Sequence, residues 1–274
     1  MLNINTNYSA AFAANAAKSS SQGLNSAMEK LSTGSRINYA KDDAAGQAIS
    51  TRLSAEIQGL NMASRNAADA QSMVDTADGA LQETQNVLLR MRELAVQSAN
   101  GTLTDADRDH TDAEFQQLEA EITRISANTK WAGQALLDGT ASSLSFQVGE
   151  GASQVITVAI ADMAANATGI ALDDDSLQSA ANAQTAIGAL DTAIATVSTE
   201  RGKLGAVSNR LSSTMSNLDQ VSVNLSSSQG RIQDADFAQE TGNLAKNQIL
   251  QQAATAMIAQ ANASKSSVLA LVRG

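Results

Sequence analysis

A seven-residue apolar repeat restricts the fold of this chain more than any other feature of its sequence. An apolar or small residue stands at every seventh position in one long segment, and the same period returns far along the chain in a second. The first series is Leu53, Leu60, Ala67, Val74, Leu81, Leu88 and Ala95; the second is Leu190, Val197, Leu204, Leu211, Leu218, Leu225 and Ile232. This period predicts long α-helices packed nearly parallel to one another, as in a coiled coil or an extended bundle.

Each series has a companion stripe a few residues further on, and the two companions differ. The first is mostly alanine, which allows close helix approach: Ala63, Ala70, Ala77 and Met91. The second includes polar residues, which predicts a narrow seam that is wet along one side: Ile194, Arg201, Ser208, Met215 and Ser222. No proline interrupts either segment, because the sequence contains none. We therefore expect the segment after Leu53 to lie beside the segment after Leu190.

The region between the two segments predicts a shorter helix and then a β-hairpin. Thr104 followed by Asp107 is a helix-capping signal, and apolar residues then step by three or four from Phe115 to Ile125. Beyond Trp131 the apolar residues alternate in two runs joined by "GEGAS": Leu144, Phe146 and Val148, then Ile156, Val158 and Ile160. This alternation predicts a hairpin at about 142–160, which we expect to project from one end of the helices.

Residues 161–175 and the two ends of the chain depart from the heptad pattern in different ways, and only the former lack a clean apolar period. Residues 161–175 carry three consecutive aspartates at 173–175, which are typical of a solvated loop and less often of a cation site. The two ends of the chain are rich in Ala, Ser, Asn and Gln. They keep a few large apolar residues at helical spacing: Leu24, Met28, Leu31, Ile249, Met257 and Ile258. Because alanine buries little area, we expect the ends to need each other or another molecule.

The composition excludes several classes of function. There is no Cys and a single His, His110, so the chain offers neither a thiolate zinc site nor a multi-histidine metal centre, and its redox compartment cannot be inferred from thiols. A net charge of -10 with 3% aromatic residues argues against nucleic-acid binding. No stretch is long and apolar enough for a membrane helix, and the N-terminus lacks the pattern of a signal peptide. We expect no cofactor and no metal.

Two adjacent carboxylates in "KDDAAGQAIS", Asp42 and Asp43, are the strongest candidates for chemistry. Paired carboxylates can bind a metal or act as general acid and base, but both tasks need further partners, and the neighbouring sequence supplies none. A carboxylate before an apolar-periodic run is instead typical of a helix cap. We therefore expect Asp42 or Asp43 to cap a helix at a structural joint.

Three long strings resemble the terminal regions of bacterial flagellin: "LSTGSRINYAKDDAAGQAIS", "RELAVQSANGT" and "RIQDADFAQETGNLAKNQILQQAATAMIAQAN". The resemblance extends over nearly all of residues 1–138 and 187–274. It departs in "NTKWAGQALLDG", where the family usually has Phe-Asn before the glycine and this chain has Trp131-Ala132. The large outer domains that the family usually inserts between the two heptad segments are nearly absent.

The resemblance implies a structural subunit of the flagellar filament, which lies outside the cell and serves swimming motility. It implies export of the unfolded chain by the flagellar type III apparatus and growth of a helical homopolymer at the filament tip. The implied partners are further copies of the chain, an export chaperone, the cap and the hook-associated proteins. No enzymatic activity, nucleic acid or membrane insertion is implied.

The resemblance also suggests residues for recognition by Toll-like receptor 5, namely Arg90, Leu94 and Glu114. Arg90 and Leu94 share a helix face by their spacing of four. The neighbouring sequence has Leu89 and Met91 where the family commonly has Gln and Val. The alternative is that these residues serve only packing between subunits.

Together these observations predict a mainly α fold: an elongated antiparallel helical bundle or coiled coil of N- and C-terminal segments with a small β-hairpin region. We expect an inner, filament-core domain of residues 1–42 and 235–274, a helical rod domain of 43–160 and 176–234, and a short variable loop at 161–175. Two other functions fit the heptads, a hook-filament junction protein of the same architecture and a cytosolic signalling coiled coil. Neither accounts as well for the three quoted strings.

Overall fold

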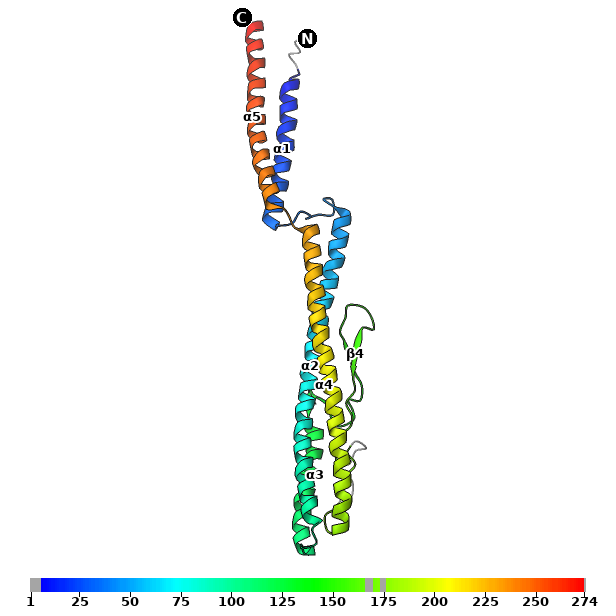
Figure 1. Ribbon diagram of the computed structural model, residues 1–274. Helices are drawn as coiled ribbons and strands as arrows, with labels where there is room; N and C mark the ends of the chain where they lie inside the picture. The colour runs from blue at the N-terminus through cyan, green and yellow to red at the C-terminus, as the bar shows by residue number, and fades with distance from the viewer. Residues whose placement is uncertain (1–5, 166–169, 173–175, 274) are drawn as a thin grey trace. The chain divides into compact units, whose positions relative to one another are not determined.

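The computed structural model describes residues 6–165, 170–172 and 176–273, with side chains described as far as Ser266. Most of this chain is helical (Figure 1). The elements in order are α1 Tyr8–Thr33, α2 Ala44–Ser98, α3 Asp105–Asn128, β1 Lys130–Trp131, β2 Gln134–Ala135, β3 Leu144–Gln147, β4 Val155–Val158, α4 Ala180–Gln233 and α5 Phe237–Arg273. They form two compact units, Met1–Ala55 with Asn224–Gly274, and Glu56–Val223. We call these the terminal unit and the central unit.

The central unit is organised around an antiparallel pair, α2 and α4, which lie side by side (Figure 1). A ladder of side-chain hydrogen bonds fixes their register, since partners move forward along α2 as they move backward along α4. From one end to the other the pairs are Asn61–Ser222, Ser64–Asp219, Gln71–Ser208, Asp78–Arg201 and Arg92–Asp191. This arrangement confirms that the segment after Leu53 lies beside the segment after Leu190.

The apolar heptad positions form the core, as their period predicts. All seven positions of the first series are buried, from Leu53 to Ala95, and so are its companions Ala63, Ala70, Ala77 and Met91. In the second series the five positions from Leu190 to Leu218 are buried, whereas Leu225 and Ile232 are half-buried. The predicted polar side of the α4 seam is confirmed as well, because Arg201, Ser208 and Ser222 all take part in the hydrogen bonds between α2 and α4.

Helix α3 begins at the predicted cap. The Thr104 side chain accepts a hydrogen bond from the Asp107 backbone, and the Asp107 side chain accepts one from the Thr104 backbone, which completes a capping box. Phe115 and Ile122 lie in the core of the unit. Arg108 is also buried, and it donates to the backbone oxygens of Ser98 and Asn100 in the connection from α2. The connection is therefore held by hydrogen bonds from the helix that follows it.

A two-residue turn joins β1 to β2 at the point where the chain departs from the family pattern. Lys130 pairs with Ala135 and Trp131 with Gln134, so Ala132 and Gly133 form the turn. Both have positive φ, 49° and 87° respectively. This is the geometry in which Asn-Gly is strongly preferred, and a side chain such as alanine is strained there.

Strands β3 and β4 form the predicted antiparallel hairpin, with Phe146 opposite Ile156. The hairpin does not project from one end of the helices, so that part of the prediction is wrong. Instead it lies along α2: Asn66 donates to the Gln147 backbone oxygen at 3.0 Å, and Glu150 lies next to Gly59. The reason is the apolar face of the hairpin, since Ile156 and Val158 are buried in the same core as the helices.

The described part of residues 161–175 also contributes to the core. Met163, Ile170 and Leu172 are at most 2% exposed, which their irregular spacing did not predict. The acidic residues 173–175 lie outside the described residues. Further on, Ser98 donates to the backbone oxygen of Leu177 and Asp112 accepts from its backbone nitrogen, so both polar groups of this residue are satisfied just before α4.

Candidate assembly interface

The terminal unit is built on a second antiparallel pair, α1 and α5 (Figure 1). Contacts along the pair fix one register: Asn7 donates to the Ala261 backbone oxygen at 3.1 Å, and Lys30 forms an ion pair with Glu240 at 3.4 Å. Between these two contacts, Gly23 faces Asn247 so closely that an added Cβ would lie 2.9 Å from the amide. The two helices therefore approach closely along their length.

The side chains of α1 and α5 that are fully buried are all small. Among the described residues of the two helices, those that are buried are Ala13, Ser20, Ala27, Ala254 and Ala261. Burial of such side chains removes little apolar surface from water compared with the leucine heptads of the central unit. The pair is therefore weakly stabilised by its own packing.

The large apolar residues of this pair are instead exposed or half-buried. Of the six predicted assembly residues, Met28, Ile249 and Met257 are 53%, 66% and 62% exposed, and Leu24, Leu31 and Ile258 are half-buried. The structure adds four exposed residues that the sequence did not single out: Tyr8, Phe12, Phe237 and Leu250. The aromatic residues among them could have been singled out by their scarcity, since the chain has only four Phe, two Tyr and one Trp.

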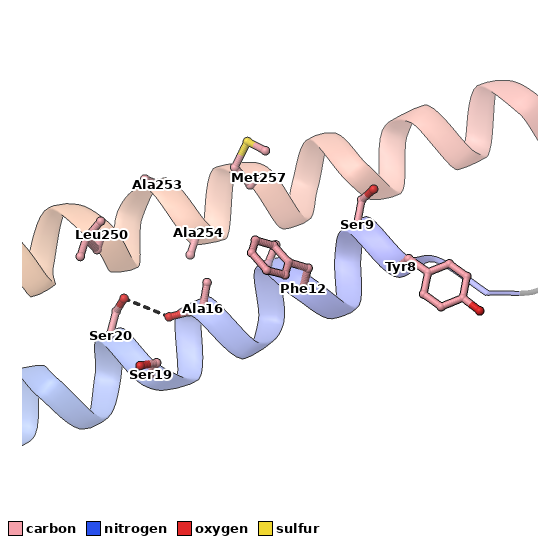
Figure 2. Close-up of a pocket in the computed structure, with 11 residues that line it drawn as sticks. Tyr8, Ser9, Phe12, Ala16, Ser19, Ser20, Leu250, Ala253, Ala254 and Met257 are labelled. Carbon is pink, nitrogen blue, oxygen red and sulfur yellow. Dashed lines mark hydrogen bonds between the residues drawn. The ribbon is translucent and has the colours of Figure 1, made fainter.

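Part of this exposed surface forms an apolar groove of about 690 Å³ between α1 and α5. Figure 2 shows Phe12 and Ala16 on α1, with Leu250, Ala254 and Met257 on the facing stretch of α5. Exposed apolar patches of this kind mark protein interaction sites. The groove offers no array of polar groups that would suit catalysis.

The paired carboxylates belong to the turn before α2, and each accepts hydrogen bonds from nearby backbone. Asp43 precedes the first helical residue and accepts from Gly46 N at 2.9 Å, which is the predicted cap. Asp42 accepts from Asn38 N and Tyr39 N, and these backbone hydrogen bonds, that of Tyr39 above all, lower the pKa of Asp42. Within the described chain, no group of three or more His, Cys, Asp or Glu side chains could hold a metal ion.

The three receptor candidates lie in the central unit and differ in accessibility. Arg90 donates to Glu114 at 2.9 Å and to Glu93 at 3.0 Å, and the Arg90 and Glu114 side chains are 50% and 47% exposed. The hydrogen bonds that Arg90 donates to Glu114 and then to Glu93 raise the pKa of Arg90. Leu94, one turn further along α2, is only 2% exposed and belongs to the core.

Comparison with known proteins accounts for both units. Residues 4–142 match the bacterial flagellin N-terminal helical region, and residues 187–272 match the bacterial flagellin C-terminal helical region. The chain belongs to the bacterial flagellin family. Flagellins are the structural subunits of the flagellar filament, an extracellular motility structure, and that is the function of this chain.

Two relatives show how much of this flagellin is shared. It is 46% identical to a flagellin of Halalkalibacterium halodurans over 90% of this chain and 91% of the relative. It is 41% identical to a flagellin of Bacillus subtilis over 99% of this chain and all of the relative. The alternative of a cytosolic signalling coiled coil is therefore wrong. In the described part of the chain, no helix is long and apolar enough to cross a membrane.

Two solved structures resemble this flagellin in fold. The crystal structure of Bacillus cereus flagellin is 37% identical and matches 56% of this chain and 88% of its own, with a TM-score of 0.51. A flagellar hook-associated protein from Vibrio parahaemolyticus is 16% identical, matches 70% of this chain and all of its own, and has a TM-score of 0.61. The second likeness shows a shared fold alone, so it does not favour the junction-protein alternative.

Proposed function

We propose that this flagellin polymerises by burying the exposed apolar residues of α1 and α5 against further copies of itself. The observation that carries this proposal is the contrast within the terminal unit. The contact between the two helices buries alanine and serine, while Phe12, Ile249 and Met257 remain more than 60% exposed. Removal of these side chains from water supplies a driving force that the isolated subunit does not use. Repeated contacts between different surfaces of identical subunits build an open helix when the rotation from one subunit to the next does not close into a ring.

The test replaces one exposed apolar side chain in each unit. Ile249→Asn places an amide in the proposed interface, and Val155→Asn is the matched control, because Val155 is 42% exposed on β4 of the central unit. Burial of an amide without partners costs about 1–3 kcal/mol. We therefore expect the concentration of subunit left after seeded growth to rise at least about fivefold for Ile249→Asn. A residual concentration of Ile249→Asn equal to that of the Val155→Asn control would contradict the proposal.

Electron microscopy of the same samples separates a filament subunit from a junction protein. A flagellin adds to its own growing end repeatedly, because each added copy presents the same surfaces again. We therefore expect long filaments from short seeds. A hook-filament junction protein would add few copies, so seeds that never lengthen in purified protein would favour that alternative.

The remaining partners follow from the role of filament subunit. We infer export by the flagellar type III apparatus with a chaperone, growth beneath a cap, and contact with hook-associated proteins. None of these steps requires the chain to catalyse a reaction, and we propose that it is not an enzyme. Hydrolytic activity above buffer that copurifies with the intact chain would contradict this.

We also propose Toll-like receptor 5 as a partner of the surface around Arg90 and Glu114. Both side chains are about half exposed, whereas Leu94 is buried and could act only by supporting the helix. Arg90→Ala should therefore weaken the response in a receptor reporter assay. Arg124→Ala is the matched control, because Arg124 is 61% exposed and forms a similar ion pair with Glu121 on α3. Equal responses to the two variants would limit Arg90 to packing between subunits.

A further inference from the structure

The methionines of this chain differ sharply in exposure. Met73, Met91 and Met163 are at most 2% exposed and lie in the central core. Three others are about half exposed or more: Met28 at 53%, Met62 at 49% and Met257 at 62%. The reaction of a thioether with peroxides follows its accessibility, so these three are open to oxidation in the free subunit.

Met257 differs from Met62 in its surroundings. It lines the apolar groove of the terminal unit together with Phe12, Leu250 and several alanines (Figure 2). Met62 is exposed on α2 in the central unit and does not line this groove. The two side chains therefore offer similar access to an oxidant, but only Met257 belongs to the surface proposed to be covered on assembly.

We propose that Met257 is a redox-sensitive modification site that controls whether a free subunit can join the filament; this inference rests on the proposed burial of α1 and α5. The thioether sulfur attacks one oxygen of a peroxide, an S–O bond forms, and the O–O bond breaks. Sulfur is oxidised by two electrons, and the peroxide is reduced to water or an alcohol once the remaining oxygen takes up the proton. The product at Met257 is methionine sulfoxide.

The sulfoxide changes the groove in one specific way. It replaces a polarisable apolar sulfur by a strong hydrogen-bond acceptor, whereas the α5 side of the groove around Met257 offers only Leu250, Ala253 and Ala254. The polar residues of the lining, Tyr8 and three serines, all belong to α1, and Ser20 already donates to the Ala16 backbone oxygen. In the free subunit, water solvates the acceptor at no penalty. In the filament the neighbouring copy would exclude that water, and an unpaired buried acceptor opposes association. Oxidation therefore acts on assembly and leaves the free subunit folded.

A competition experiment on the unmodified sequence tests this directly. Free subunits are treated with hydrogen peroxide until about one sulfoxide per chain has formed, and seeds are then extended with the mixture. Filaments and the remaining soluble subunits are separated, and the sulfoxide at each methionine is quantified by peptide mass spectrometry. We expect the Met257 sulfoxide to be at least about tenfold rarer in filaments than in the soluble fraction. The Met62 sulfoxide, the internal control, should differ by less than about twofold.

A variant supplies the second arm. Met257→Leu conserves volume and apolar character. With Met28→Leu in both chains, those that also carry Met257→Leu should still enter filaments after the same peroxide treatment, whereas those that keep Met257 should be depleted. Enzymatic reduction of the sulfoxide should return oxidised parent chains to the filament.

The redox proposal alone is overturned if untreated subunits extend seeds and the Met257 sulfoxide is as frequent in filaments as in solution. It is also overturned if the sulfoxides of Met62 and Met257 are depleted equally. Failure of untreated subunits to extend any seed would overturn the assembly proposal, and this one with it.

Discussion

Arg201 of α4 donates from Nε to Oδ1 of Asp78 on α2 at 2.8 Å, and a second nitrogen of the same guanidinium donates to Gln85 at 2.8 Å. Arg201 occupies a position where a simple coiled coil would place an apolar residue. The ion pair explains why an arginine is tolerated at this position. Its guanidinium lies at the edge of the contact between α2 and α4, while the heptad residues on either side, Val197 and Leu204, remain buried. Polar residues at such positions are a recognised means of fixing register.

The first prediction concerns the apolar part of the same contact between α2 and α4. Leu211 is fully buried between two of the hydrogen-bonded pairs that join α2 to α4, so Leu211→Asp places an unpaired charge in the core. We expect the free energy of unfolding of the central unit to fall by about 3–5 kcal/mol. Trp131 fluorescence in urea reports it, because this is the only Trp of the chain and it packs against that core.

The control for this substitution lies on the same helix. Val223 is 63% exposed, so Val223→Asp should change the free energy of unfolding by no more than about 0.5 kcal/mol. If the two variants unfold at the same urea concentration as the parent, the packing of α4 on α2 is not the one described.

Two glycines of α2 make a second matched comparison. An added Cβ at Gly79 would meet nothing within 4 Å, whereas one at Gly59 would lie 3.2 Å from Cβ of Glu150 in the hairpin turn. Gly79→Ala should therefore stabilise the free subunit by about 0.5–1 kcal/mol, the usual gain in helix propensity. Gly59→Ala should gain less or lose stability, because the hairpin must shift. Equal gains in thermal unfolding would show that the hairpin does not rest on Gly59.

The turn at Ala132 provides a third prediction. Its φ of 49° is strained for alanine and well tolerated by asparagine, the residue that the family usually has there. Ala132→Asn should raise the free energy of unfolding by about 0.5–1 kcal/mol, measured by circular dichroism in urea. Ala152→Asn is the control, since Ala152 lies in the other hairpin turn and is not among the residues with positive φ. A gain at both positions would point to a general effect of asparagine.

The capping box of α3 predicts a pH dependence. Hydrogen bonds from the Thr104 side chain and then its backbone lower the pKa of Asp107. Because the folded pKa lies below the unfolded value of about 4, this carboxylate contributes stability above pH 4, and the contribution is lost as the pH falls through the folded pKa. Asp107→Asn should therefore destabilise the central unit by a constant amount above about pH 5, and the difference from the parent should shrink below about pH 4. A difference that stays constant down to pH 2 would contradict this; Trp131 fluorescence in urea at each pH measures it.

The central core could be predicted from sequence because its cause is local and periodic. A seven-residue period places every heptad leucine on one helix face, and the same face meets the partner helix over its whole length. The orientation of the hairpin depends on which helix face remains uncovered, and the alternation of Phe146 and Ile156 does not contain that information. The burial of Leu94 illustrates the same limit, since a spacing of four from Arg90 identifies a shared side of the helix but not its neighbours.

The candidate interface could be predicted only in part, for a related reason. Spacing identified Met28, Ile249 and Met257 as belonging to helices, and the alanine content indicated close packing. Which side of α1 faces α5, and which side faces solvent, depends on the antiparallel register of the two helices. Contacts such as Asn7–Ala261 and Lys30–Glu240 set this register. These contacts join residues at opposite ends of the chain. Phe12 was missed because an isolated aromatic among alanines has no period.

The weak internal packing of the terminal unit leads to the last prediction, which concerns proteolysis. Each residue of α1 and α5 loses about 1–2 kcal/mol of backbone entropy on ordering, while their mutual contact buries mostly alanine. We therefore expect the pair to open readily in the free subunit and to become stably helical when neighbouring copies cover its apolar residues. Trypsin should cut the free subunit early at the terminal-unit sites Lys18, Lys30, Lys41, Arg231, Lys246 and Lys265 and leave a resistant central fragment, whereas the same sites should survive in filaments. The internal control is Arg210 on α4, which lies within the central unit and should be cut slowly in both forms. If the terminal sites of the free subunit resist trypsin as well as those of the filament, the two helices form a stable domain before assembly and coupled folding is wrong.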